Sequence, residues 1–484
     1  MKRLYIFILM ISITIAASTQ NLVDALRYSQ TFAGSSARAL SMGGAFGSLG
    51  GDISSVSINP AGIGVYRKSE FSFTPGFLYA IDKSEYKSEK NEDFKYSFKL
   101  NNIGFVSAVK TNNPTGVTGY SFGFTYNRIN DFNNNIMIEG VNSNNSLADY
   151  FLDNSNGLDP EGLDAFYERL AFDAYIIDTI PDSDNEYDTP VLLPITQRKS
   201  IRTNGGMGDW AFSFGANINH KLYVGASIGF ISVRYTALSD HSEFDDLNQN
   251  DFNNFRMSEE LITKGSGFNF KAGFIVKPVN PVRIGGSVNF PTRIKLQDEY
   301  YITMRSGFDN GDSYTVYPTY SDGSRIEIGI SEYDLVTPLK INGSLGIQVK
   351  KFALLGVDIE YVDYATSRIR KINNDYNFDD VNDEIQEAYK SVLNIKTGAE
   401  IRTGQLSYRA GFAYYPSPFE SNEINKDASH TNITGGLGFR DKNFFLDIGG
   451  AYSLNEEKYS LYYDNIATIT GNKLKLLATI GFRF

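Results

Sequence analysis

The chain contains no cysteine and has little tryptophan or histidine. Its 484 residues include one Trp and three His, which are His220, His241 and His430. Without Cys the chain has no disulfide framework, no thiolate metal site and no lipidated cysteine of a bacterial lipoprotein. The histidines fall in separate predicted segments, so neither a Ser-His-Asp site nor haem ligation is indicated. We expect no enzymatic activity, no catalytic residue, no metal and no cofactor.

Long hydrophobic runs are also missing after the first residues. A membrane-crossing helix needs roughly 18 apolar residues, and no such run occurs beyond position 20. Residues 4–17 are mostly apolar, follow Lys2 and Arg3, and lead into small residues ending at Ser18. That order is typical of a secretory signal peptide. We expect 1–19 to be a signal peptide and the mature chain to be exported.

A clustered basic face is the third feature that the sequence lacks. The formal net charge is −11. The excess acid lies in the segments 131–206, 236–264 and 302–336, whereas the rest of the chain is mildly basic without a basic cluster. A nucleic-acid surface needs concentrated Lys and Arg, so nucleic acid is excluded as a partner.

Aromatic residues are abundant, and many sit in stretches that alternate between apolar and polar. The last residues, 473–484, show this pattern, and so do 210–219 and 268–277. A strand of about ten residues with one apolar and one mixed face fits a wall between lipid and a polar lumen. A soluble sandwich also alternates, so the connections between strands must decide.

We predict fourteen long strands from this pattern. They lie near 69–80, 96–109, 118–129, 208–219, 221–235, 265–277, 281–301, 337–349, 352–366, 391–402, 405–415, 430–440, 442–454 and 473–484. Short connections such as His220-Lys221 alternate with long ones. This asymmetry is typical of outer-membrane barrels, with short periplasmic turns and long external loops. The sequence therefore predicts an all-β, transmembrane antiparallel β-barrel over 69–484, located in the outer membrane of a Gram-negative cell.

The segment 20–68, ahead of the first strand, does not alternate and is rich in Gly, Ala and Ser. Its glycines are not followed by the Lys-Ser/Thr of a phosphate loop. A fourteen-stranded barrel has a lumen too wide for side chains alone to fill. We therefore expect 20–68 to be a plug, or hatch, inside the lumen.

Three parts of the chain carry a family pattern: the segment ahead of the first strand, a mid-barrel region and an aromatic carboxy-terminus. These are Arg38-Ala39, Met42-Gly43-Gly44-Ala45, Asp52 and Asn59-Pro60-Ala61; then Pro281 to Pro291 with Thr337-Pro338; and Phe484. In these parts the chain resembles the FadL/TodX family of outer-membrane transport proteins. The segment 131–206, which we expect to be partly helical, has no counterpart in that pattern.

The resemblance implies a channel for passive uptake of hydrophobic molecules, either long-chain fatty acids or aromatic hydrocarbons. It assigns Arg38, Asn59, Pro60 and Ala61 to the hatch motif. It also implies sideways release through a kink in the third strand, where Gly119 and Gly123 lie, although Gly123 also fits a small lumen residue. The expected partners are hydrophobic small molecules, outer-membrane lipid and lipopolysaccharide, and the barrel-assembly machinery through Phe484.

Two alternatives stay open. One is an accessory barrel of the same fold in a secretion or surface-attachment system, as in the PorV branch. The other is a lipid hydrolase, which would need a catalytic cluster that the sequence does not show.

One loop carries an apolar stripe. Asp159-Pro160-Glu161 has the composition of a helix start, and Leu163, Phe166 and Leu170 would then share one face. This stripe is either an external groove that captures a hydrophobic ligand or a surface that packs on the barrel mouth.

Overall fold

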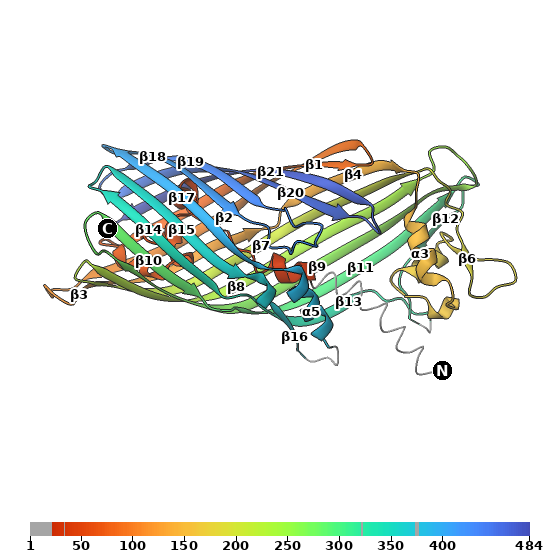
Figure 1. The fold of residues 1–484 in the computed structure, drawn as a ribbon, viewed down its shortest axis with the longest axis horizontal. Helices are drawn as coiled ribbons and strands as arrows, with labels where there is room; N and C mark the ends of the chain where they lie inside the picture. Colours follow the sequence, from red (N-terminus) through yellow and green to blue (C-terminus); the bar gives the residue numbers. More distant parts are fainter. Residues whose placement is uncertain (1–21, 33, 321–322, 373–376) are drawn as a thin grey trace.

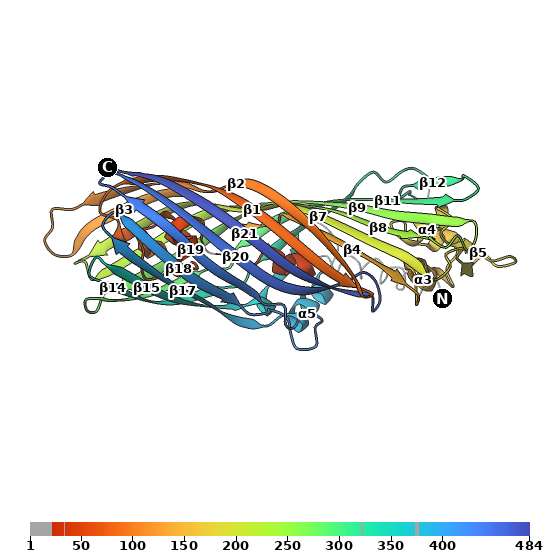
Figure 2. The ribbon, with the colours of Figure 1, turned by 90° about the horizontal axis from the view of Figure 1, so that it is seen from above.

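The chain forms a closed antiparallel β-barrel. A computed structural model describes residues 22–32, 34–320, 323–372 and 377–484, so the expected signal peptide lies outside the described residues. The wall has fourteen strands, and β21 pairs with β1 to close it. Figures 1 and 2 show an elongated cylinder of steeply tilted strands. The predicted fourteen-stranded barrel is confirmed.

The wall strands follow one another around the barrel in chain order. They are β1 (Glu70–Tyr86), β2 (Glu89–Lys110), β3 (Val117–Asp131), β7 (Ile195–Ile218), β8 (Leu222–Phe244), β9 (Phe252–Val276), β10 with β11 (Val282–Asn289, Arg293–Phe308), β13 with β14 (Gly329–Val336, Lys340–Val349), β15 with β16 (Ala353–Asp363, Arg368–Lys371), β17 (Ser391–Thr403), β18 (Leu406–Tyr415), β19 (His430–Arg440), β20 (Phe444–Ser460) and β21 (Ile466–Arg483). β4 (Asn134–Asn142) continues the line of β3 along β7.

The remaining elements lie in the lumen or in the loops. They are α2 (Ala37–Ser41), η1 (Ile53–Ser57), η2 (Pro60–Val65), α3 (Leu147–Ser155), η3 (Pro160–Gly162), α4 (Glu168–Asp173), β5 (Asp178–Thr179), β6 (Tyr187–Asp188), β12 (Ser313–Val316), η4 (Tyr364–Thr366) and α5 (Asp379–Ala388). Among the described residues, no helix is long and apolar enough to cross a membrane.

The predicted alternation places apolar side chains on the outside of the wall. Phe212 and Phe214 are exposed, whereas Ala211 and Ser213, which alternate with them, are buried toward the lumen. The same holds on β15, β17, β18, β21 and the 268–276 part of β9, where the exposed residues are mostly aromatic or aliphatic. An apolar outer surface of this extent is unfavourable in water and suits surrounding lipid.

The two ends of the barrel differ. At one end, here called the turn end, short connections join the strands and Phe484 pairs with Ser69 through two backbone hydrogen bonds of 3.1 Å. At the other end, the loop end, strands β7, β8, β9 and β11 extend farther than β14, β15, β17 and β18 (Figure 2). The connection predicted at 81–95 is wrong, because the strands continue to a two-residue turn at Lys87 and Ser88, whose φ angles are 50° and 70°.

The described part of the amino-terminal segment lies inside the barrel (Figure 1). Residues 34–65 are nearly all buried and bond to several wall strands. The Ala37 amide donates to Thr479 Oγ1 on β21, and the Gly43 amide donates to Thr434 Oγ1 on β19. On the opposite side, Ser287 Oγ of β10 donates to the Ile58 carbonyl. Residues 34–65, called the hatch below, therefore fill the part of the lumen nearest the turn end.

Candidate functional site: the barrel lumen

Arg38 ties the hatch to the wall. It lies on α2, a helix whose first turn is capped by Ser36, because Ser36 Oγ accepts a hydrogen bond from the Ala39 amide. Arg38 is 3% exposed, and its Nε lies 2.8 Å from Glu400 Oε2 on β17. Glu400 also pairs with Arg402 and Arg409 of the wall. A buried carboxylate shared by three guanidinium groups holds this contact in one geometry.

Asn59, Pro60 and Ala61 form a second contact on the opposite side. Asn59 Nδ2 donates to the Gly47 carbonyl at 2.7 Å and to the Phe274 carbonyl of β9 at 3.0 Å. Its Oδ1 accepts the Ala61 amide and so caps η2, in which Pro60 takes the first position. One side chain therefore starts the helical turn and joins the hatch to the wall.

Close backbone approach explains two of the glycines between hatch and wall. Gly43 has φ +62°, and a Cβ there would lie 2.6 Å from the Phe412 carbonyl oxygen. A Cβ on Gly225 of β8 would lie 2.4 Å from the Pro60 carbonyl oxygen. Any larger side chain would force the hatch away from the strands.

The third strand is continuous where Gly123 lies. The β2–β3 ladder runs without a shift from Asn102↔Asn127 to Lys110↔Gly119. A register shift against β7 occurs between Val117 and Gly119, close to the turn end. A Cβ on Gly123 would lie 2.4 Å from Ile63 Cδ1, so this glycine makes room for the hatch.

A large apolar cluster fills the lumen on the loop-end side of the hatch. This luminal cluster combines inward side chains of the wall with Ala25 and Tyr28 from the amino-terminal segment and with Val381 and Ile385 from α5. Its wall members include Ile129, Met207, Ile231, Val233, Ile294, Leu296, Leu335 and Val392. Residues 22–28 and α5 therefore close the apolar part of the lumen from the loop end.

A small cavity lies between the luminal cluster and the hatch. Its volume is about 80 Å³, and its lining changes from Ile129, Ile231 and Ile294 on one side to Lys271, Lys340, Glu360 and Lys396 on the other. An apolar wall that ends on ammonium groups is complementary to an amphiphile with a long tail and an acidic head.

Among the described residues, Lys340 is the cavity lysine that forms no ion pair, although Glu360 of the same cavity interacts with it electrostatically. Lys271 pairs with Asp209 at 2.6 Å, and Lys396 lies 3.4 Å from Glu360. The Lys340 ammonium, on a residue that is 7% exposed, donates instead to the Ser29 carbonyl and Thr31 Oγ1, both in the amino-terminal segment. In the described chain, its hydrogen-bond partners are therefore neutral oxygens that a ligand carboxylate could replace.

The wall is interrupted beside this cavity. Between the pairs Asn289↔Lys340 and Arg293↔Val336, the adjoining strands carry Pro291 and Pro338, which have no amide hydrogen to donate. The alternation of the side chains also shifts by one residue here. Even-numbered residues such as Ile284 face outward before the interruption, and odd-numbered residues such as Lys295 face outward after it. Phe290, Thr337 and Pro338 line the cavity from this position.

The loop-end cap contains the predicted apolar stripe, but the packing differs from the expectation. Leu163 and Leu170 are buried in a cluster with α3 and the inner faces of β9 and β11, and Phe166 packs against Tyr300. The continuous helix expected from Asp159 is wrong. A turn, η3, ends at Gly162, and α4 begins only at Glu168. In this conformation the two leucines form the core of the cap and are not an open groove.

The sequence reasoning missed Lys340, Glu360 and Lys396. They lie on three neighbouring strands, each facing the lumen, and only the barrel brings them together. The sequence did contain a signal, because burying an unpaired lysine or glutamate at an inward position of a membrane strand costs free energy. The strands β14 and β15 each contain one such residue, and β17 contains two, Lys396 and Glu400.

Solved structures share this architecture across nearly the whole chain. A FadL homologue from Pseudomonas aeruginosa matches with a TM-score of 0.55 and 14% identity, covering 93% of this chain and 99% of that one. The toluene transporter TodX from Pseudomonas putida matches with a TM-score of 0.53 and 12% identity, covering 94% of this chain and 100% of that one. No protein-family model and no curated protein sequence matches. The chain therefore has the fold of the FadL-type barrels.

Proposed function

We propose that the protein is an outer-membrane channel for passive uptake of hydrophobic molecules. The observation that carries the proposal is the luminal cluster, an apolar interior that leads from the loop-end cap to the hatch. The apolar outer wall supports a place in a membrane, and the FadL-type fold supports the outer membrane. The loop end then faces outward and the turn end faces the periplasm.

A ligand has to displace part of this interior. A cavity of roughly 150 Å³ is needed to hold benzene, and the cavity here measures about 80 Å³. Residues 22–32 supply Tyr28, Ser29, Thr31 and Phe32 to its lining. We propose that this stretch moves when a ligand enters, while the hatch stays anchored at Arg38 and Asn59.

Lys340 favours amphiphilic acids over neutral hydrocarbons within this proposal. A carboxylate at Lys340 would gain a charge-assisted hydrogen bond in place of the Ser29 and Thr31 oxygens. The acyl chain would enter the luminal cluster, where each buried CH₂ contributes roughly 0.8 kcal/mol. Long-chain fatty acids have this chemistry, whereas a TodX-type aromatic hydrocarbon would leave Lys340 unused.

The route out of the lumen is the second part of the proposal. The resemblance places it at Gly119 and Gly123 in the third strand. The interruption around Pro291 and Pro338 supports a different position, because it adjoins the cavity and neither proline can donate a ladder hydrogen bond. A single backbone bond, from the Thr337 amide to the Thr292 carbonyl, joins the two strands between the regular ladders. We propose release sideways at this wall break, since an apolar solute gains nothing by entering the aqueous periplasm first.

The test is uptake by cells that lack their own long-chain fatty-acid transporter. Cells expressing the protein should accumulate radiolabelled oleate faster than empty-vector cells, and Lys340→Gln should reduce oleate uptake severalfold but leave toluene uptake unchanged. Lys350→Gln, an exposed turn residue, is the matched control. Equal uptake with and without the protein would overturn the channel. Equal oleate uptake by Lys340→Gln would remove the assignment to acids.

One observation favours a second candidate, an accessory barrel that does not transport. The described lumen is almost filled, because the hatch, residues 22–28 and α5 occupy it from both ends. A barrel that serves only as a docking platform needs no open path. Absence of uptake for both probes, together with a stable large complex after mild detergent extraction, would support this candidate.

A further inference from the structure

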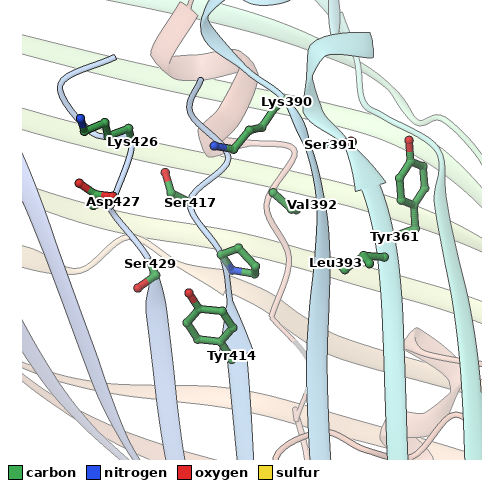
Figure 3. A pocket seen from close by; sticks show the side chains of 11 residues that line it. Tyr361, Lys390, Ser391, Val392, Leu393, Tyr414, Ser417, Lys426, Asp427 and Ser429 are labelled. Atoms are coloured by element: carbon green, nitrogen blue, oxygen red, sulfur yellow. The ribbon is translucent and has the colours of Figure 1, made fainter. Parts of the chain in front are cut away.

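The outer surface of the barrel has a pocket near the loop-end edge of its apolar wall. The pocket measures about 570 Å³ and lies over β15, β17, β18 and the segment 416–429. Its side chains include Tyr361, Leu393 and Tyr414 from the strands and Lys390 and Lys426 from the segments beyond them. In Figure 3 the two lysines lie at one end of the pocket and Tyr414 and Leu393 lie farther along the strands.

Strand length sets the height of the pocket relative to the bilayer. A barrel strand crosses the hydrocarbon layer in roughly nine to eleven residues, and β18 has 10. Its outward residues Leu406, Tyr408 and Phe412 are exposed and apolar, and Tyr414 is the last of them before Pro416 and Ser417. The pocket therefore lies where the hydrocarbon ends and the lipid headgroups begin.

The polar end of the pocket carries a net positive charge. Lys390 and Lys426 face one acid, Asp427, and neither ammonium is paired with a carboxylate in the described chain. Ser391 and Ser429 add hydroxyl groups at the same level. This end is complementary to an anionic group with several acceptor oxygens.

The apolar end excludes a free ion as the occupant. Tyr361 and Leu393 are 41% and 52% exposed toward the bilayer and would contact an acyl chain directly. Two exposed lysines bind a dissolved anion weakly, because solvent screens them. A lipid already held in the membrane is presented at high effective concentration, which raises its occupancy without further contacts.

We infer that this pocket binds a phosphate-bearing glycolipid of the outer leaflet, the lipid A part of lipopolysaccharide. The headgroup phosphate contacts Lys390 and Lys426, sugar hydroxyls contact Ser391 and Ser429, and an acyl chain lies along Leu393 and Tyr361. The assignment rests on the outer-membrane location in the proposed function, but not on transport. Its role is to hold the lipid against the side of the barrel formed by β15, β17 and β18, where the wall strands are short and end at the membrane surface.

Native mass spectrometry of the purified barrel with added lipid A tests the site. The double variant Lys390→Gln with Lys426→Gln should bind lipid A roughly tenfold more weakly than the unchanged chain. Lys351→Gln with Lys442→Gln removes the same charge from the turn end and should bind as the unchanged chain does. Dephosphorylated lipid A should bind weakly to both, and millimolar inorganic phosphate should not displace lipid A.

Two results would overturn the inference. One is equal binding of lipid A by the Lys390 and Lys426 double variant, and the other is equal binding of the dephosphorylated lipid by the unchanged chain. Replacement of both lysines by arginine keeps the charge and should keep binding, which separates recognition from misfolding. Oleate uptake is measured on the same variants. If the variants lose lipid binding but keep oleate uptake, the transport proposal stands. If the protein binds lipid A but does not raise oleate uptake, the lipid site stands and the transport proposal fails.

Discussion

Buried charges in the lumen are paired across elements that are distant in sequence. Arg38 and Glu400 are 362 positions apart and meet only when the hatch is inside the closed barrel. Removing Glu400 would cost roughly 3–5 kcal/mol, because Arg38 would stay buried without compensation. Removing Arg38 would cost less, because Glu400 keeps its pairs with Arg402 and Arg409. Replacing both by apolar residues of similar size costs far less. The ion pair therefore acts mainly to select one position of the hatch.

Glu168 is an acid whose burial makes the loop-end cap sensitive to pH. It opens α4, and burial, helped by the charge of Asp164, raises its pKa to about 7. An acid with a raised pKa favours the folded cap fully below its ordinary pKa of 4.5. This contribution is lost as the pH rises through about 7, because the folded cap must then hold a buried charge.

We predict that the cap opens more readily at pH 8 than at pH 5.5. Hydrogen exchange of the amides in 146–195, corrected for the intrinsic pH dependence, should be faster at the higher pH. Glu168→Gln should make the two values nearly equal, since glutamine cannot ionise. Glu161→Gln changes an exposed acid of the same loop and should leave the difference in place. An unchanged difference in Glu168→Gln would assign the effect to another group.

At the scale of elements, the short helices of the hatch depend on their surroundings. α2 has five residues and η2 has six, and isolated helices of that length do not persist in water. The wall supplies the missing partners, as when Phe274 accepts from Asn59 and Thr479 from Ala37. The hatch is therefore expected to order only after the barrel has closed.

The wall break can be compared with the third strand by cross-linking, because the chain has no cysteine. Arg293 and Val336 are partners at the edge of the break, and Phe105 and Phe124 are partners between β2 and β3. Directly opposed residues of antiparallel strands are close enough for a disulfide. We predict that a disulfide between cysteines at 293 and 336 slows oleate uptake severalfold and that reduction restores it.

The disulfide between cysteines at 105 and 124 is the matched comparison and should leave uptake unchanged. If this second cross-link slows uptake and the first does not, the exit lies at the third strand, as the resemblance implies. If neither cross-link matters, the wall does not open at these positions.

For the whole molecule, closure of the wall and filling of the lumen are separate. The ladder continues around the barrel through strand–strand bonds and does not pass through the hatch. We predict that deletion of residues 22–62 leaves a barrel that still migrates faster in gels before heating, while its conductance in planar bilayers rises severalfold. An unchanged conductance would show that the hatch does not block the path, and loss of the heat shift would show that the wall needs it.

The alternating stretches were sufficient to predict the number of wall strands. Each apolar face has to meet lipid, so the period-two pattern of 210–219 or 473–484 depends on few distant contacts. The extensions beyond the membrane were missed, as in 81–95, because both of their faces meet water or polar loops and the alternation weakens there. The stripe of Leu163 and Leu170 was recognised as apolar, but its partners on β9 and β11 were not visible in the sequence.

The sequence by itself determined the barrel and its two unlike ends, since these depend on local composition and period, while the export signal expected at 1–19 stays a prediction. Only the tertiary structure decided the site. It placed Lys340, Glu360 and Lys396 around one cavity, set Arg38 against Glu400, and brought Pro291 beside Pro338. The physical reason is that barrel closure and hatch insertion join residues hundreds of positions apart, and no periodicity along the chain records which inward side chains will meet.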